Sequence, residues 1–544
     1  MTHSGSADSE LRAAARHLGR RRFLTVTGAA TALAFGTNLP DTARAAAAAR
    51  EPRFTREPFT LGVGSGDPLP DSVVLWTRLA PQPFEPDSGM PARPVPVHWE
   101  LAYDADFRRV AHRGTVVAHP EYHHAVHAEP RGLEAGTDYW FRFRAGRHLS
   151  AVGRTRTAPA AGSAPGAVRF ALASCQRYDQ GYYTAYRHLA AEPDLDAVLH
   201  LGDYLYEYAV NAAAGARGYT GEARLPELFH RETVTLEDYR LRYSLYKGDE
   251  DLQAAHAAAP WIVTWDDHET ENNYADAIPE NGVPPEEFLL RRAAAYRAYW
   301  ENMPLRRPQR PEGPDLALYR RLHYGRLAQI DVLDTRQYRD DQANGDGWKP
   351  PTPESEDPAR QLLGATQERW LTEGWHASDA VWNVLAQQVV FSRRRSRAES
   401  TSPLSMDAWD GYPAARERVL RAADAAGIEN LAVLTGDVHV HYGLDIKRDA
   451  DDPASRTAGV EVVTSSVSSG GDGAERPGNW DRLTGANPHL RLYDGRRGYV
   501  VLRLDERRLR ADYRVVPHVT RPGAPVTTAA SLVSAVGDPG LRPA

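Results

Sequence analysis

Four short apolar runs each lead directly into residues that can bind a metal ion, and this pattern constrains the fold more than any other feature of the chain. Each run has the length and composition of a buried strand. The four segments are Arg169–Ala173 followed by Cys175, Ala197–Leu201 followed by Asp203 and Tyr206, Trp261–Trp265 followed by Asp267 and His268, and Leu431–Leu434 followed by Asp437 and His439. Sites in α/β sheets form outside the carboxyl ends of strands, where loops converge. The four strand ends therefore predict one shared cluster.

The donor atoms in these segments restrict the chemistry of such a cluster. They comprise carboxylates, a phenol, a thiol and imidazole rings, a set too rich in oxygen for the closed Cys and His tetrahedra of structural zinc sites. No segment matches a calcium-binding EF-hand loop. Phenolate and thiolate suit a ferric ion, whereas carboxylates suit calcium, magnesium or manganese. We predict a bridged pair of ions, which favours phosphate ester hydrolysis because two metals can hold the attacking and leaving oxygens and lower the pKa of a bound water.

The mature chain divides into a β-rich part followed by a part in which strands and helices alternate. Turn residues separate short alternating runs between residues 55 and 157, which predicts a small N-terminal all-β domain of the fibronectin or immunoglobulin type. Residues 167–515 predict a larger layered domain of the α/β or α+β class. Residues 516–544 are expected to form a C-terminal tail, with a short terminal helix at Ala529–Val536.

Several local patterns add detail to this division. The predicted elements with the clearest bounds are strands at Val73–Thr77, Val97–Tyr103 and Asp138–Phe143 and a helix at Glu286–Met303. Gly136-Thr137-Asp138-Tyr139 resembles the tyrosine corner of fibronectin-type domains. His123, His124 and His127 are interpreted as one solvated face of a strand, in preference to a metal cluster. The Ser468–Gly473 loop lacks the Lys of a P-loop and is expected to lie near the site.

The first 45 residues have the order of a signal peptide. Arg20 and Arg21 precede an apolar stretch from Phe23 to Leu39, and Ala43-Arg44-Ala45 supplies a cleavage pattern of small residues. The Arg pair followed by x-Phe-Leu resembles a twin-arginine signal. We therefore expect the chain to use the twin-arginine export machinery and to be secreted, outside the cell or in the cell wall. No later stretch approaches about 18 consecutive apolar residues, so no membrane span is expected.

Charge and cysteine content exclude two further classes. The 544 residues include 65 Lys and Arg and 72 Asp and Glu, which gives a net charge of -7. This balance offers no general basic surface for binding nucleic acid. The single cysteine, Cys175, forbids an intramolecular disulfide and must be a buried filler, a free thiol or a ligand. Its place at a strand end favours the ligand.

At these residues the sequence resembles the PhoD-type alkaline phosphatases. These belong to the metallophosphoesterase superfamily and are related to purple acid phosphatases and to the iron-dependent phospholipase D enzymes of actinobacteria. The resemblance covers nearly everything after the signal and rests on Ala173-Ser174-Cys175-Gln176, Gly202–Tyr208, Trp265–Glu269, Leu333–Arg339, Trp409–Pro413 and Thr435–His439. It implies a β-sandwich flanked by helices, with a ferric ion and a calcium ion at the centre.

The resemblance also implies a ligand set. Carried over by position, the ferric ion would be held by Cys175, Asp203, Tyr206 and His439, with Asp203 bridging to a divalent ion held by Asp267 and Asp437. Calcium is the expected divalent ion, with manganese or magnesium as alternatives. Three points stay open: Asn272 or Asn273 is an alternative source of an amide ligand, Asp410 is an alternative ligand for a second calcium, and His441 is interpreted as a neighbour that does not ligate.

A mechanism follows from the same carry-over. A metal-bound hydroxide or oxide would attack phosphorus in line, and His268 or a metal-bound water would protonate the leaving alkoxide. Because charge accumulates on the equatorial oxygens, an arginine near the cluster would help. Arg336 and Arg339 are the candidates, and a surface ion pair with Asp340 or Asp341 is the alternative interpretation. The predicted catalytic residues are therefore His268, Asp203 and Arg336.

Three functions remain to be compared. The leading one is a secreted phosphatase and phosphodiesterase that hydrolyses small phosphate esters at alkaline pH and scavenges phosphate. The alternative within the same superfamily is a phospholipase D acting on phospholipid head groups. A third is a surface-binding protein with a relic metal site, against which the intact ligand set argues. The resemblance and the apolar C-terminal piece together suggest that residues 516–544 cover the pocket as a lid.

Overall fold

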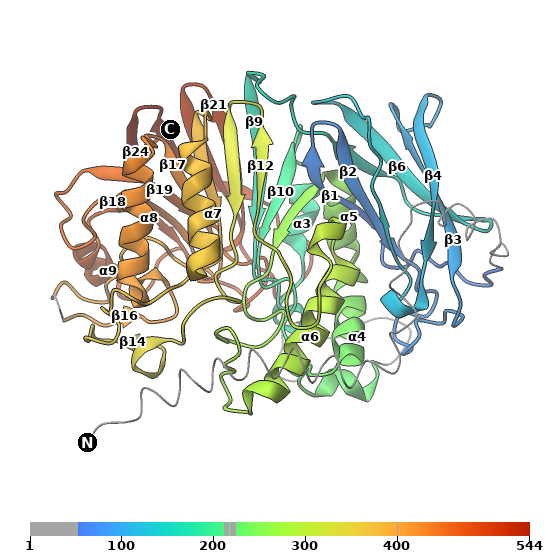
Figure 1. The fold of residues 1–544 in the computed structure, drawn as a ribbon, viewed down its shortest axis with the longest axis horizontal. Coiled ribbons are helices and arrows are strands. Elements are labelled where there is room, and N and C mark those ends of the chain that lie inside the picture. Colours follow the sequence, from blue (N-terminus) through green and yellow to red (C-terminus); the bar gives the residue numbers. More distant parts are fainter. Residues whose placement is uncertain (1–52, 211–216, 218–224, 400) are drawn as a thin grey trace.

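Two large β-sheets pack face to face, and helices cover the outer face of each sheet (Figure 1). The structure is a computed structural model that describes residues 53–210, 217, 225–399 and 401–544. The predicted signal peptide at residues 1–45 lies outside the described residues. The expected β-sandwich flanked by helices is confirmed. No helix in the described part of the chain is long and apolar enough to cross a membrane.

The first sheet has ten strands, three of which carry predicted ligands at their carboxyl ends. In spatial order they are β24 (Asp538–Pro543), β23 (Thr527–Ala535), β22 (Arg508–Val516), β21 (Arg497–Asp505), β9 (Ala167–Ala173), β10 (Ala197–Leu201), β11 (Trp261–Thr264), β1 (Val63–Leu69), β2 (Ser72–Arg78) and β5 (Ala125–Ala128). The central strands β9, β10 and β11 are parallel. Parallel strands covered on both faces read as continuous apolar runs, which explains their sequence pattern.

The second sheet has seven strands and contributes the fourth ligand-bearing end. In spatial order they are β12 (Arg320–Tyr324), β13 (Ala328–Val332), β15 (Trp382–Ala386), β17 (Leu431–Thr435), β19 (Thr457–Val463), β18 (His441–Lys447) and β20 (Leu490–Asp494). Strands β13, β15, β17 and β19 are parallel to one another. The predicted strand at Leu431–Leu434 is therefore a central strand of this sheet.

Apolar side chains from both sheets form one core between them. Phe170, Leu199 and Ile262 from the first sheet belong to the same buried cluster as Ile330 and Val384 from the second. Full burial of such a side chain contributes about 1.5–3 kcal/mol. This shared layer fixes the two sheets against each other, and with them the loops that follow the strands.

Helices enclose the sandwich from both sides. Four helices contribute to the core on the first sheet: α3 (Thr184–Ala190), α4 (Leu236–Lys247), α5 (Glu250–Ala258) and α6 (Pro285–Asn302). Two helices contribute to the core on the second sheet: α7 (Gly364–His376) and α8 (Pro413–Ala425). A short helix α9 (Trp480–Ala486) and the small sheet of β14 (Trp348–Lys349) and β16 (Leu404–Ser405) complete the domain. The 3-10 turns are Pro120–Tyr122, Tyr178–Gln180, Glu227–His230, Arg307–Gln309, Ala343–Gly345 and Trp409–Gly411. Helix α6 confirms the helix predicted at Glu286–Met303.

The N-terminal region forms a third sheet and also extends the first. The third sheet contains β4 (Val110–Ala118), β3 (Val95–Ala102), β6 (Asp138–Ala145), β7 (His148–Leu149) and β8 (Gly153–Arg156). The three strands predicted in this region are confirmed as β2, β3 and β6. Tyr139 is buried, and its hydroxyl accepts a hydrogen bond from the Glu134 N–H at 2.9 Å, as in a tyrosine corner. Because β1 pairs in parallel with β11, the N-terminal strands continue the ten-stranded sheet.

His123 and His124 are buried and His127 is partly covered, so the predicted solvated face is wrong. His123 contacts Ser88 and Arg78 through its two ring nitrogens, at 2.9 and 3.2 Å. His127 stacks on Trp300 of α6 with ring centroids 4.1 Å apart. The alternating pattern did not reveal that helix α6 covers this face. Burial lowers the pKa of His127 to about 4, which favours the neutral ring there.

The C-terminal residues form strands, and the terminal helix predicted at Ala529–Val536 is wrong. Strand β23 pairs antiparallel with β22 over almost its whole length, and β24 pairs with β23. Leu532 and Leu541 are buried in the core between the sheets. The available edge of β22 outweighs the weak helical preference of the alanines. The lid predicted for residues 516–544 therefore stays a prediction only for the loop at residues 517–526.

Replacing Leu532 with alanine should lower the free energy of unfolding by about 2–5 kcal/mol, because the change leaves a cavity in the shared core. Denaturant unfolding measures the effect. Thr527→Ala, at an exposed position of the same strand, is the matched control and should change stability by less than about 0.5 kcal/mol. Equal stability of the two variants would show that this segment does not belong to the core.

Candidate metal centre

The predicted ligands lie where loops from both sheets meet at one edge of the sandwich. Gly202 lies against the loop after β11, and a Cβ there would be 2.6 Å from the Asp266 backbone nitrogen. Gly436, after β17, lies against the loop after β9, and a Cβ there would be 2.8 Å from the Ser174 hydroxyl. The Cys175 N–H also donates to the Gly202 carbonyl at 3.1 Å. Glycine is required at both approaches because any side chain would separate the loops.

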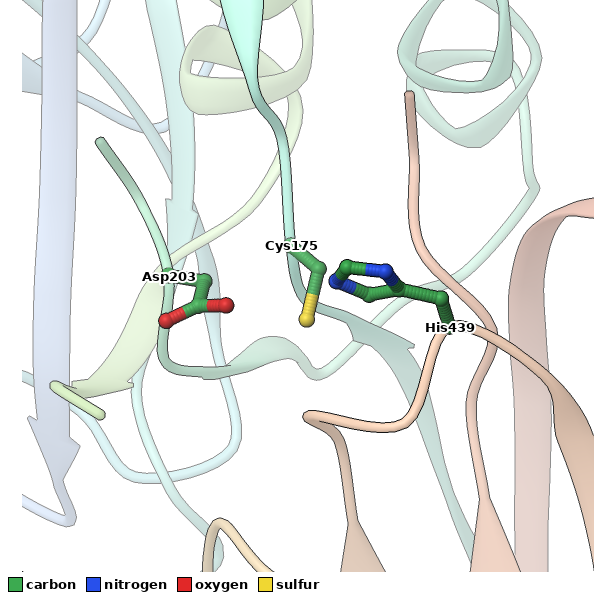
Figure 2. A group of neighbouring side chains, drawn as sticks. All are labelled: Cys175, Asp203 and His439. Carbon is green, nitrogen blue, oxygen red and sulfur yellow. The ribbon is translucent and has the colours of Figure 1, made fainter. Parts of the chain in front are cut away.

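Two groups of donor atoms assemble at this edge. In the first, the Cys175 sulfur, an Asp203 oxygen and a His439 ring nitrogen lie within 4.8 Å of one another. Figure 2 shows these three side chains pointing toward a common centre. In the second group, Asp203 is joined within the same distance by Asp267 and His268. Asp203 belongs to both groups, as a ligand that bridges two ions would.

Tyr206 completes the first group. Its hydroxyl donates to Asp203 Oδ2 at 2.7 Å and lies 3.2 Å from His439 Nε2. The Ser469 hydroxyl donates to the same phenolic oxygen at 2.8 Å. This contact confirms that the loop containing Ser468–Gly473 lies near the site. The phenolic oxygen thus faces the same centre as the carboxylate and the imidazole.

Backbone donors orient Asp267 in the second group. The His268 N–H donates to Asp267 Oδ1 at 2.8 Å, and the Asn273 N–H donates to Oδ2 at 2.7 Å. The Asn273 amide donates to Asp346 at 2.7 Å, whereas the Asn272 amide donates to Glu280 at 2.8 Å, and both bonds leave the amide oxygens uncommitted. The choice between these amides as ligands stays a prediction.

Most of the predicted ligands have a strained backbone. The non-glycine residues with left-handed φ include Cys175 (59°), Asp203 (58°), Asn273 (50°), Asp437 (62°) and His439 (55°). Such a conformation costs about 1–3 kcal/mol per residue when it is sparsely populated, and it persists only where the surroundings fix it. Strain of this kind is common at functional sites, and its presence at five predicted ligands is consistent with such a site.

The charges in this centre fit bound cations. Burial, with the Asp203 charge adding to it, raises the pKa of the Cys175 thiol well above its ordinary value. Burial and the neighbouring Asp203 and Cys175 likewise raise the pKa of Tyr206. Burial also raises the pKa of Asp203, where Asp267 adds to the effect and His268 opposes it. Asp203 Oδ1 is buried without a hydrogen-bond partner. A buried pocket of acidic groups with an orphaned oxygen suits metal ions, which keep such donors deprotonated.

Asp437 and His441 follow the fourth strand end. Burial raises the pKa of Asp437 to about 6, and Asp407 adds to the effect while Arg336 opposes it. His441 is fully buried, and its Nδ1 accepts a hydrogen bond from the Ser465 N–H at 3.0 Å. Neither Asp437 nor His441 belongs to either group of donor atoms, so Asp437 as a ligand and His441 as a neighbour both stay predictions.

His268 is held beside the centre by Glu207. Its Nδ1 lies 2.8 Å from Glu207 Oε2, and its ring packs on Tyr206 with centroids 4.1 Å apart. Burial alone would lower the pKa of His268, but the carboxylates of Glu207, Asp267 and Asp203 outweigh it and hold that pKa well above the ordinary value. The ring is therefore fixed in orientation and favours its protonated form, as a proton donor requires.

Arg336 and Arg339 are buried, with exposed fractions of 0% and 2%, so a surface ion pair with Asp340 or Asp341 is wrong. The segment after β13 runs beneath the centre, where Arg339 donates to the Tyr274 carbonyl at 2.9 Å. The sequence did not distinguish this path from a surface loop.

Buried carboxylates share the charge of these two arginines. Arg336 donates to Asp266 and, at 2.9 and 3.0 Å, to both oxygens of Asp407, and it lies 3.8 Å from Asp267 Oδ2. Arg339 contacts Asp407 at 2.8 Å. This geometry supports a positioning role for Arg336, acting through Asp267, in place of direct contact with substrate.

Asp410 is engaged in a separate network. Its carboxylate accepts from Arg416 at 2.7 Å and from the Arg394 N–H at 2.9 Å, and Arg393 lies 3.3 Å away. Because two guanidinium groups neutralise this carboxylate, the structure does not support Asp410 as a ligand for a second calcium ion.

Glu269 is a structural residue of the centre that the sequence patterns did not single out. Its carboxylate accepts hydrogen bonds from the backbone N–H groups of Asp203 at 3.1 Å, Tyr204 at 2.7 Å and Asp266 at 3.0 Å. It thereby ties the loop after β10 to the loop after β11. The only signal for it was its place beside His268 in the Trp265–Glu269 motif.

Comparison with known proteins places this fold and site in one class. The profile of the PhoD-like phosphatase family matches residues 170–513, and that of the N-terminal domain of PhoD-like phosphatases matches residues 44–159. Alkaline phosphatase D of Bacillus subtilis (strain 168) is 49% identical over 523 residues, covering 96% of this chain and 88% of that protein. A solved structure of PhoD matches with a TM-score of 0.86 at 50% identity, covering 90% of this chain and 93% of the other.

The fold and the comparisons define a phosphoric ester hydrolase. The chain belongs to the PhoD-like phosphatase family, which confirms the resemblance in its sequence. Its function is that of a phosphatase, and a phospholipase D function is not favoured.

Replacing Arg336 with methionine should destabilise the protein by about 3–5 kcal/mol, because Asp266 would remain buried without its guanidinium partner and Asp407 would keep only Arg339. Thermal or denaturant unfolding checks this. The control, Arg482→Met at an exposed position of α9, should change stability by less than about 0.5 kcal/mol. Unchanged stability of Arg336→Met together with a large fall in kcat would instead indicate direct contact with substrate.

Proposed function

We propose that the chain is an exported, metal-dependent phosphatase with two neighbouring ions in the site. A ferric ion would be held by Cys175, Asp203, Tyr206 and His439. A divalent ion would be held by Asp203 and Asp267, with Asp437 and the Asn273 amide added from the sequence. Calcium is the divalent ion of choice, with manganese or magnesium as alternatives, because its ligands are hard oxygens. The observation that carries the proposal is the membership of Asp203 in both groups of donor atoms.

The donor types support this division of the ligands. Sulfur, phenolic oxygen and imidazole nitrogen meet on the Cys175 side, where a ferric ion is favoured. Carboxylate oxygens meet on the Asp267 side, where an oxygen-preferring ion is favoured. When bound, such ions supply Lewis acidity toward the phosphoryl group and toward the attacking water.

His268 is the proton donor to the leaving oxygen. Glu207 holds one ring nitrogen, and Tyr206 supports the ring face, so the imidazole keeps one orientation beside the centre. A ring nitrogen of His268 lies within 4.8 Å of both Asp203 and Asp267, next to the position that a phosphoryl group would occupy. Glu207, which is not a proposed ligand, favours the protonated form of the ring and raises the pKa of His268.

The expected substrates are small phosphate esters, both monoesters and diesters, hydrolysed to release phosphate for uptake. The name alkaline phosphatase D of the Bacillus subtilis relative supports this class. Export through the twin-arginine machinery is proposed from the sequence of residues 1–45. The mature phosphatase would then act outside the cell or in the cell wall.

Replacing Cys175 with alanine should remove iron from the purified protein, because the change deletes the sulfur ligand of the first group of donor atoms. Metal analysis and the visible charge-transfer absorption of protein purified without chelator measure the loss. His441→Gln is the control, since the imidazole is a buried neighbour that belongs to neither donor group. Iron and colour retained in Cys175→Ala, or lost equally in His441→Gln, would contradict the ligand assignment.

Replacing His268 with asparagine should lower kcat by about 10²–10⁴-fold for an alkyl phosphate, because the leaving alkoxide then lacks a proton donor. An aryl phosphate, whose leaving group needs little protonation, should lose far less. Steady-state kinetics with both esters, on protein of verified metal content, provide the comparison. An equal loss with the two esters would contradict proton donation and indicate a phosphate-binding role for His268.

A further inference from the structure

A phosphatase must attract an anion into a pocket that is itself lined by carboxylates. A guanidinium group that contacts phosphate has to keep N–H groups and charge free for it. Arg336 and Arg339 do not meet this requirement, because Asp266, Asp267 and Asp407 already share their charge beneath the centre. The substrate-facing cation therefore has to be sought elsewhere on the rim.

Three consecutive arginines follow strand β15 and differ in their partners. Arg393 contacts Asp451 at 3.1 Å and Asp410 at 3.3 Å, and Arg395 also pairs with Asp451. Among the described residues, no carboxylate lies within ion-pair distance of the Arg394 side chain, and its buried Nε has no hydrogen-bond partner. Arg394 makes no ion pair with Asp451 in the described part of the chain, unlike both of its neighbours.

Aromatic rings hold the Arg394 side chain. Its guanidinium carbon lies 5.0 Å from the ring centroid of Trp348 and 5.8 Å from that of Tyr442. Trp348 is 45% exposed, so this arrangement is open to solvent at one side. A cation that stacks on ring faces keeps the N–H groups at its edge available. The backbone is fixed as well, because the N–H groups of Arg394 and Arg395 donate to Asp410 and Asn487.

The two rings belong to segments that border the metal centre. Tyr442 packs with Val438, which lies between the predicted ligands Asp437 and His439. Trp348 follows Asp346, whose carboxylate accepts the hydrogen bond from the Asn273 amide. Arg394 therefore stands at the rim of the centre, on the side of Asp437.

We propose that Arg394 binds an anionic oxygen of the substrate phosphoryl group, and that Trp348 and Tyr442 hold its guanidinium in position for that contact. The proposal rests on the phosphatase function and names a residue that fixes substrate preference. A monoester carries up to two negative charges on phosphorus and a diester carries one. Because the attraction of a cation grows with the charge of its partner, Arg394 favours monoesters over diesters.

Arg394→Gln is the test. Arg395→Gln is the matched control: it removes the same charge at the next residue, whose side chain is already paired with Asp451. The measurements are kcat and KM for 4-nitrophenyl phosphate and bis(4-nitrophenyl) phosphate, and the inhibition constant of inorganic phosphate. For Arg394→Gln, the monoester KM and the phosphate inhibition constant should rise about 10–100-fold, the loss expected for a charge-assisted hydrogen bond. The diester KM should rise less, and Arg395→Gln should match the wild type within about twofold.

An inhibition constant for phosphate that is equal in the two variants would overturn the proposal, while wild-type phosphatase activity would leave the proposed function standing. A fall in kcat with unchanged KM and phosphate inhibition would also overturn it, since that pattern reflects disturbed structure and not lost binding. If Arg394→Gln fails to fold, Arg394→Lys takes its place. That variant keeps the charge but loses the planar fork, so its phosphate inhibition constant should rise several-fold, and a wild-type value would overturn the proposal.

Discussion

The whole site depends on how closely four loops from two sheets can approach one another. Gly202 lies against Asp266 in the loop after β11, and Gly436 lies against Ser174 in the loop after β9. Each glycine directly precedes an aspartate of the proposed ligand set. A Cβ at either position would separate the loops and with them the carboxylates. The Gly-Asp pairs are therefore a requirement of packing as much as of metal chemistry.

The energetic balance of the centre follows from this close approach. Left-handed backbone at Cys175, Asp203 and His439 is unfavourable by itself, and burial disfavours the ionised thiol, phenol and carboxylate. Hydrogen bonds from the loops to Glu269 and the shared core between the sheets offset part of this cost. Bound cations would offset the rest, since they stabilise the charged forms that burial opposes.

The arginines around the centre show how position divides one residue type between two tasks. Arg336 and Arg339 lie beneath the ligands and satisfy buried carboxylates, so they maintain the shape of the site. Arg394 lies at the rim with aromatic partners and no carboxylate partner in the described part of the chain. A guanidinium with its charge already shared positions its neighbours, whereas one with its charge free is suited to an incoming anion. The distinction depends on surroundings and not on sequence motif.

The sequence by itself determined the class of the site. The spacing and composition of the apolar residues mark the buried strands, and the residues that follow these strands have side chains that can bind metal ions. The strand ends at Cys175, Asp203 and Asp267, the helix α6 and the layered fold were all predictable on that basis. The stacking of His127 on Trp300, the strand β23 in place of a helix, and the surroundings of Arg394 were decided only by the tertiary structure. Each of these depends on contacts with residues far away in the chain: a covering helix, a free sheet edge and two aromatic rings. The local secondary-structure propensity of a segment does not depend on such distant partners. Burial by these partners outweighs the small conformational preference that a short segment has alone.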